Sequence, residues 1–186
     1  MANIAKDVII PTTSGIFRVV FLYVGQGDST LLVVPAGTAY KYVLIDSNED
    51  ESAGGIRLLD MLKDLFKGTE DKLEVYINTH PHKDHLDMVK KIYKEVGIRQ
   101  VWHSGHKPGS EHKDAYKDLE YVMKEVGEEN VFRLRGSRED NKLDETTIKL
   151  GDTDYNVLAP ADYVSDEIED EKPEDRYRRI HEQCGV

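Results

Sequence analysis

One strand-to-helix junction constrains the fold of this chain more than any other feature. The β-rich run at 73–78 ends directly before the octapeptide T-H-P-H-K-D-H-L, and apolar residues with helical spacing follow over 86–97. Pro81 removes a backbone donor and biases His80 toward extended geometry, which favours a tight turn. Asp84 is placed to cap the following helix. The pattern predicts a strand end, a turn and a helix start, which gather side chains at the rim of a sheet.

Four residues of metal-binding type fall within this turn: His80, His82, Asp84 and His85. Imidazole suits zinc, manganese and iron, and a carboxylate adds a hard oxygen ligand. His80 and His82 lie two positions apart and can point the same way, whereas Asp84 and His85 would face a second position. The spacing therefore favours two divalent ions, zinc first and manganese second, about 3.5–4 Å apart as in two-metal hydrolysis. A solvated polar turn is the alternative interpretation.

Strands and helices are predicted along the whole chain by the same patterns. Strands are expected at 16–24, 29–34, 40–46, 73–78, 98–102, 131–134, 146–150 and 155–158, and helices at 56–66, 86–97 and 114–126. The first two strands should form a hairpin joined by the turn G-Q-G-D. The alternation predicts an α/β fold.

Three motifs resemble one known family. The H-x-H-x-D-H pattern after a hydrophobic strand resembles the signature of the metallo-β-lactamase fold superfamily. The segment F-L-Y-V-G-Q-G-D-S-T-L-L at 21–32 looks like the V-G-Q-G-D hairpin of the soluble metallohydrolase domain of ComEC-type competence proteins. V-L-I-D-S at 43–47 is similar to the L-I-D element that follows this hairpin, and V-L-A-P at 157–160 looks like a later L-x-P element. The resemblance is specific over about 17–97 and holds only in outline beyond.

The resemblance implies a metallo-β-lactamase-type αββα sandwich, of which this chain carries the first half and part of the second. Residues 1–160 would form the incomplete domain, and 161–186 an acidic loop or tail leading toward a missing C-terminal part. Eight acidic residues between 161 and 175 fit such a solvated segment. The family's later ligands, two histidines and a bridging aspartate, have no counterparts after Pro160. We therefore expect the N-terminal portion of a longer protein, which the intact mass of the native gene product would test.

The activity implied by the resemblance is metal-dependent hydrolysis. Two ions would share a water and lower its pKa toward about 7, so that a metal-bound hydroxide attacks the substrate. Asp84 would be catalytic by orienting this hydroxide besides binding metal. The expected function is a ComEC-like phosphodiesterase or nuclease, acting on small-molecule or nucleic-acid phosphodiesters. A hydrolase of esters, thioesters or lactams with the same site, and a non-catalytic scaffold that retains a partial metal site, are the alternatives.

Further residues are expected to orient the metal ligands or to contact the substrate: Asp46, Gln26, Asp28, His103 and His106. In the family the aspartate of L-I-D orients the metal-binding loop, and the hairpin tip with Gln26 and Asp28 lies near the site. A structural role in the turn is the alternative for the hairpin tip. His103 and His106 follow a predicted strand and fit substrate contacts or replacement ligands, or else polar loop residues. His112 and His181 are interpreted as surface histidines.

Composition and charge limit the kinds of partner and the cellular location that this chain is expected to have. The net charge of −11 argues against a surface that grips long duplex DNA, which usually requires a basic patch. Bound metal ions would still attract a phosphodiester. No apolar run reaches the length of a transmembrane helix, the N-terminus lacks the apolar core of a signal peptide, and Cys184 is the single cysteine. A cytoplasmic protein is expected. A sheet edge left open by the missing half predicts a homo-oligomer or a partner that completes it.

Overall fold

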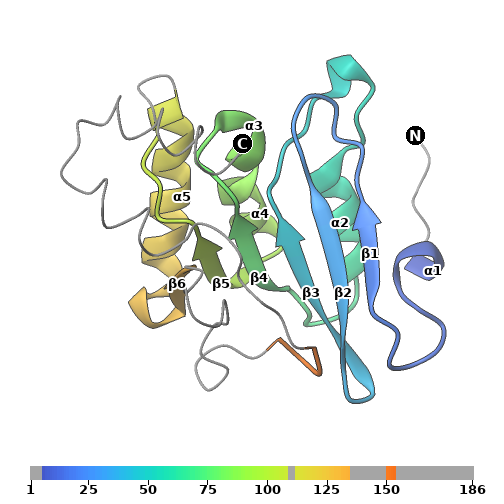
Figure 1. Ribbon diagram of the computed structural model, residues 1–186. Helices are drawn as coiled ribbons and strands as arrows, with labels where there is room; N and C mark the ends of the chain where they lie inside the picture. Colours follow the sequence, from blue (N-terminus) through green and yellow to red (C-terminus); the bar gives the residue numbers. More distant parts are fainter. Residues whose placement is uncertain (1–5, 109–111, 135–149, 154–186) are drawn as a thin grey trace, which may run out of the picture.

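Six strands form one mixed sheet, in which they stand in the same order as in the chain (Figure 1). The computed structural model describes residues 6–108, 112–134 and 150–153. Its strands are β1 (Arg18–Phe21), β2 (Thr30–Ala36), β3 (Ala39–Ile45), β4 (Leu73–Asn78), β5 (Ile98–His103) and β6 (Val131–Arg133). Its helices are α1 (Lys6–Ile9), α2 (Leu58–Phe66), α3 (Lys83–Leu86), α4 (Val89–Glu95) and α5 (Lys113–Val126), with 3-10 turns at Glu51–Ala53 and Glu128–Asn130. The predicted α/β class is confirmed.

The direction of the strands changes at β3. β1, β2 and β3 are antiparallel neighbours, which confirms the predicted hairpin, with Phe21 paired to Thr30 beside its turn. β3, β4, β5 and β6 are parallel to one another, and helices run between them. Since parallel strands joined by crossovers end at the same side, the carboxyl ends of these four strands share one edge of the sheet. The predicted rim of functional residues lies there.

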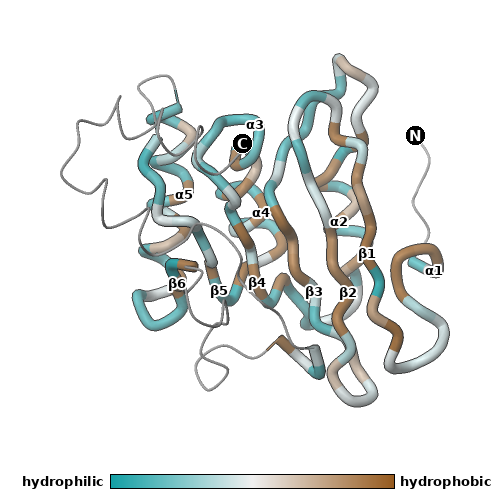
Figure 2. Tube along the Cα trace, in the orientation of Figure 1, coloured by the Kyte–Doolittle hydropathy of each residue, from teal (hydrophilic) through white to brown (hydrophobic). Residues whose placement is uncertain are grey.

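The main core lies between the sheet and the helices α2, α4 and α5, which cover one face (Figure 1). Strand residues alternate between the two faces, so Val33 and Leu44 join this core while their neighbours Val34 and Val43 point to the other side. A smaller apolar cluster on that opposite face contains Val34, Val43, Val75, Trp102 and Leu150. Figure 2 shows the strands as mainly hydrophobic and the segment around α3 as hydrophilic. Both faces of the sheet are therefore apolar.

The helix after the motif differs from its prediction. α3 already begins at Lys83, inside the motif, and the extended residue His82 stands at its N-cap position. Asp84 lies in the first turn of α3 and is not the cap. His82 still has an extended backbone, with φ −85° and ψ 149°, and the helix begins immediately after it. The predicted single helix is also divided, since α4 starts anew at Val89.

Several predictions concern other parts of the chain. Within the described strands, β1 pairs only with β2 and forms one edge of the sheet, where Phe21 is 83% exposed. Pairing of this edge with a partner stays a prediction. Every helix in the described residues falls short of the length and apolarity needed to cross a bilayer. Outside the described residues lie positions 146–149 of the strand expected at 146–150, the strand expected at 155–158, the acidic segment 161–186, His181 and Cys184.

Candidate metal centre

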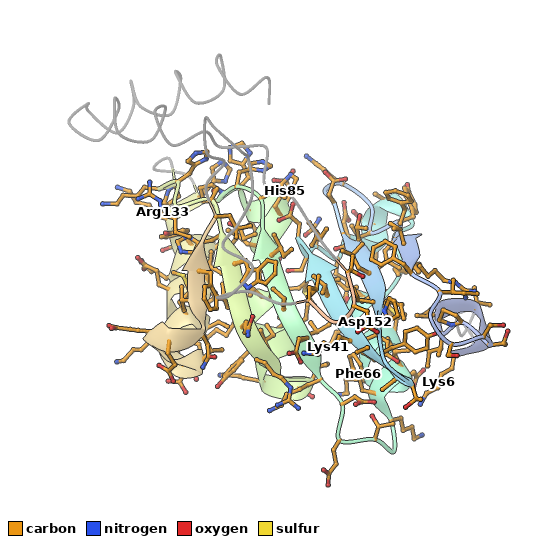
Figure 3. The ribbon with its side chains drawn as sticks, turned by 60° about the horizontal axis from the view of Figure 1, so that its bottom comes forward. Lys6, Lys41, Phe66, His85, Arg133 and Asp152 are labelled. Atoms are coloured by element: carbon orange, nitrogen blue, oxygen red, sulfur yellow. The ribbon has the colours of Figure 1, made fainter. Side chains whose placement is uncertain are left out.

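The site residues predicted from the sequence lie at the carboxyl ends of the parallel strands. Asp46 follows β3, the motif follows β4, and His103 ends β5. The described residues contain six of the chain's seven histidines, and all of them belong to this edge or to the loops above it: His80, His82, His85, His103, His106 and His112. Figure 3 shows His85 and Arg133 along the same edge. The fold therefore concentrates nearly all imidazole groups of an acidic protein in one region.

The buried carboxylate of Asp46 connects the segments of this region. Its Oδ1 accepts hydrogen bonds from the backbone N–H of Thr79 at 2.9 Å and from the side-chain amide of Asn78 at 3.3 Å. Its Oδ2 accepts the hydroxyl of Thr79 at 2.5 Å and lies 2.9 Å from Nδ1 of His85. Asp46 has φ 55°, the one positive φ of a non-glycine residue in the described chain. Four contacts to its side chain hold this uncommon backbone conformation in place.

These hydrogen bonds determine which ring nitrogen carries the proton in His80 and His85. The ionised carboxylate of Asp46 only accepts, so Nδ1 of His85 carries the proton that it donates. The Thr79 hydroxyl donates its single proton to Asp46 and therefore accepts from Nδ1 of His80, which lies 3.0 Å away. In their neutral forms both imidazoles consequently present Nε2 as a lone pair. A carboxylate that orients histidines in this manner is typical of metal sites in proteins.

Three residues form the tightest group of metal-binding type. The ligand atoms of Asp46, His80 and His85 all lie within 4.8 Å of one another. The ring centroids of His80 and His85 are 4.0 Å apart, and the ring of His82 lies 4.5 Å from His80 and 6.4 Å from His85. Asp84 precedes His85 in α3 and is half-buried, outside this group. The structure thus brings His80, His85 and the predicted orienting residue Asp46 together, with His82 beside them.

The donor chemistry of this group fits a divalent ion. Nε2 is the ligating nitrogen that His80 and His85 can each offer, because both Nδ1 atoms are engaged in hydrogen bonds. The four contacts of the Asp46 carboxylate commit it to orienting the loop rather than to ligation. Imidazole nitrogens with carboxylates close by suit zinc and manganese. The region can therefore hold a metal ion.

The electrostatic field around His85 also favours a cation. Burial lowers the pKa of His85, but the hydrogen bond and charge of Asp46, followed by the charges of Asp84 and Asp28, outweigh it and raise the pKa above its ordinary value. Negative potential that favours an imidazolium favours a metal cation equally. The three carboxylates come from three separate segments of the chain, so the tertiary fold creates this field.

The β1–β2 turn is docked on the motif, as predicted for the hairpin tip. A β-carbon on Gly27, whose φ is +107°, would overlap the backbone oxygen of Asp84. The Asn48 side chain donates to the backbone oxygen of Gln26, whose own side chain is exposed. Asp28 is 78% exposed, and its Oδ2 lies 3.9 Å from Nε2 of His85. Asp28 thus lies beside the motif, whereas Gln26 contributes its backbone.

His103 and Arg133 lie on neighbouring strands next to the motif. Asn78, His103 and Arg133 are in register across β4, β5 and β6. The backbone N–H of Gly105 donates to Nδ1 of His103 at 3.2 Å, and burial followed by the positive charge of Arg133 lowers the pKa of His103. Gly105 is so close to Arg133 that a β-carbon there would overlap its guanidinium nitrogen Nε. His106 lies in the loop after β5 and its backbone N–H donates to Ser104.

Comparisons with known proteins assign no family to this geometry. No protein-family model matches the chain, and no curated protein matches it. The chemistry of the site therefore has to be argued from its own residues.

Two residues that contribute to the site were not predicted from the sequence. His112, interpreted as a surface residue, stacks on His82 with ring centroids 4.5 Å apart and accepts the backbone N–H of Lys83 on Nδ1 at 3.2 Å. Tyr76 is fully buried and its hydroxyl donates to the backbone oxygen of His85 at 3.0 Å. His112 lies outside any motif. Tyr76 occupies a strand position whose pattern indicates only packing.

Proposed function

We propose that this chain carries the metal centre of a hydrolase of the metallo-β-lactamase type, which binds two zinc or manganese ions and cleaves phosphodiesters. The observation that carries the proposal is the hydrogen-bond chain from Asp46, which orients His80 and His85 so that Nε2 is the metal-binding atom of each at the edge of the sheet. His82 beside His80, and Asp84 beside His85, offer the additional donors that two ions need.

The arrangement of layers supports the αββα sandwich as the complete architecture. Helices cover one face of the six-stranded sheet, and the apolar side chains of Val34, Val43, Val75 and Trp102 on the opposite face are buried as well. An apolar sheet face requires a covering layer. In the proposed sandwich a second sheet supplies this layer.

The division of roles follows from the positions of the residues. Divalent ions, when bound, polarise a phosphoryl oxygen and lower the pKa of water. Asp46 holds His80 and His85 in the tautomers that can bind metal. Asp84, in the first turn of α3, is proposed to orient the attacking water.

Arg133 supports an anionic substrate over a neutral ester. It is in register with His103, which is in register with Asn78 immediately before the motif. Two strand spacings of about 4.8 Å therefore separate the backbones of Arg133 and Asn78. Arginine binds phosphate oxygens through several N–H donors, so a guanidinium at this distance suits a phosphodiester that spans the metal site.

Two chromogenic substrates test this proposal. Zinc- or manganese-loaded protein should hydrolyse bis(p-nitrophenyl) phosphate, and His85→Ala should remove both the bound metal, measured by ICP-MS, and the activity. Arg133→Ala should lower kcat/KM for this phosphodiester by about tenfold or more, as expected for one lost charged hydrogen bond, and leave p-nitrophenyl acetate unchanged. Arg99→Ala is the matched control, because Arg99 is exposed on β5 and pairs with Glu74. Stoichiometric metal binding without turnover would instead favour the non-catalytic scaffold.

A further inference from the structure

The turn between β1 and β2 brings a carboxylate to the one available nitrogen of His85. Nδ1 of His85 donates to Asp46, so Nε2 is the ring nitrogen with which His85 can bind a metal ion. Oδ2 of Asp28 lies 3.9 Å from this Nε2, although the two residues belong to distant parts of the sequence. The approach is fixed by backbone packing, because Gly27 lies against the backbone oxygen of Asp84 with no room for a β-carbon.

We propose that Asp28 is a metal ligand, supplied by the N-terminal hairpin to the same ion that His85 binds through Nε2. This inference rests on the metal centre of the proposed function and adds a donor to it. The site then draws its ligands from two segments, the hairpin and the motif, and closes only when the hairpin docks.

The distance between the two atoms fits one shared ion. Zinc binds imidazole nitrogen at about 2.0–2.1 Å and carboxylate oxygen at about 2.0–2.2 Å, so a tetrahedral ion separates two such ligands by roughly 3.4 Å. The observed 3.9 Å exceeds this separation by about half an ångström. The separation is also too long for a hydrogen bond between Asp28 and His85. An exposed aspartate can make the remaining shift by a small rotation of its side chain.

The surroundings of the two atoms favour ligation over a solvated turn residue. Asp46 already has four hydrogen-bond contacts and keeps its position without an ion. Asp28 is 78% exposed, so its carboxylate does not serve the packing of the hairpin. The glycine on its N-terminal side is nevertheless docked tightly on the motif. This combination places an exposed carboxylate beside a metal-binding nitrogen.

Binding of Co²⁺ to the full chain tests the proposal by a readout independent of activity. The d–d absorption bands of Co²⁺ report its ligands, and titration gives its affinity. Asp28→Asn should weaken Co²⁺ binding by about tenfold or more and change the position or intensity of these bands. Asp64→Asn is the matched control, with the same change in charge at an exposed position on α2, and should match the wild type. Far-UV circular dichroism checks that each variant is folded.

The outcomes separate this proposal from the proposed function. Loss of one negative charge lowers affinity without altering the ligands, so a wild-type Co²⁺ spectrum in Asp28→Asn overturns the proposal at any affinity. If His85→Ala then abolishes binding, the proposed metal centre still stands. If the wild type binds no Co²⁺, both the ligand proposal and the proposed function fail. Partial recovery of the wild-type spectrum in Asp28→Glu, which restores a carboxylate, would support ligation further.

Discussion

Replacing Asp46 by asparagine should move the imidazole proton of both His80 and His85 from Nδ1 to Nε2. Asparagine tolerates the positive φ of 55° at this position, so the substitution isolates the side chain from the backbone. Its amide oxygen can replace Oδ1 and keep the contact with the backbone N–H of Thr79. Its NH2 group then occupies the position of Oδ2 and donates where the carboxylate accepted. Nδ1 of His85 then has to accept a hydrogen bond from this NH2 group, so the imidazole carries its own proton on Nε2.

The tautomer of His80 should change in the same way, through the hydroxyl of Thr79. The threonine hydroxyl would accept from the introduced amide and turn its own proton toward Nδ1 of His80, which moves the proton of that ring to Nε2 as well. A metal ion then has to displace a proton at both nitrogens. Substitution of groups that orient metal ligands typically costs 10–100-fold in affinity, about 1.4–2.7 kcal/mol. Loss of hydrogen bonds to a charged acceptor should also lower the stability of the metal-free protein by about 1.5–3 kcal/mol.

Two measurements check this prediction. Competition with a chromophoric chelator gives the Zn²⁺ affinity, and long-range proton–nitrogen NMR correlations identify the tautomer of each imidazole. Thr79→Val provides an internal comparison, because it interrupts the connection to His80 while His85 keeps its contact with Asp46. Wild-type affinity in Asp46→Asn, with protons still on both Nδ1 atoms, would refute the assignment of Asp46 as the residue that sets both tautomers.

Two further predictions concern the docked hairpin and the pH dependence of stability. Gly68→Ala should lower the free energy of unfolding only by the strain of its positive φ, about 1–2 kcal/mol, because a β-carbon there meets nothing within 4 Å. Gly27→Ala should lower it by about 1–3 kcal/mol more, because its β-carbon also overlaps the backbone oxygen of Asp84. Equal shifts of the urea midpoint for the two variants would contradict the tight docking. Burial and the charge of Arg133 lower the pKa of His103, so the unfolded chain takes up this proton first. The contribution of His103 to the free energy of unfolding should therefore fall as pH decreases below about 6.5 and level off below its folded-state pKa, whereas the raised pKa of His85 contributes with the opposite sign. His103→Gln should flatten this dependence in metal-free protein and Arg133→Ala should raise the pKa of His103 in an NMR titration; a pKa of His103 at or above about 6.5 in the wild type would count against this explanation.

Local patterns sufficed to predict the elements around the site. The strand at 73–78 matches β4 in both bounds, because β-branched and aromatic residues alternate there up to the polar motif. The hairpin turn was predicted from its glycines, and Gly27 indeed has a φ of +107°. The predicted start of the helix after the motif was wrong, because capping propensity pointed to Asp84 whereas His82 stands at the N-cap. Propensity ranks residue types at a cap, whereas the boundary lies where the extended backbone ends, here at His82.

Relations between distant segments were less accessible from the sequence. The stacking of His112 on His82 depends on where α5 begins above the motif, and no periodicity encodes that position. Tyr76 fits the apolar pattern of a strand, so its hydrogen bond to the backbone of His85 has no local signal. The orienting role of Asp46 was expected from the resemblance of V-L-I-D-S to the family's L-I-D element. Its effect on His80 requires the position of the Thr79 hydroxyl, which only the structure supplies.

The distribution of the site over three segments couples metal binding to folding. The β1–β2 turn, the end of β3 and the motif meet through Gly27, Asp46 and His85, and the contact between Asp46 and His85 spans 39 residues of sequence. The motif holds four of the proposed ligands, but Asp28 and the orientation of His80 and His85 by Asp46 require the fold, so the folded chain should bind metal more tightly than the unfolded chain. Binding energy at the centre is then folding energy. A saturating ion should stabilise the docking of the hairpin together with the motif, and Asp46→Asn should lose part of this stabilisation in proportion to its lowered affinity. The hydrogen bonds of Asp46 thus both hold these segments together and orient the two histidines that are proposed to bind metal.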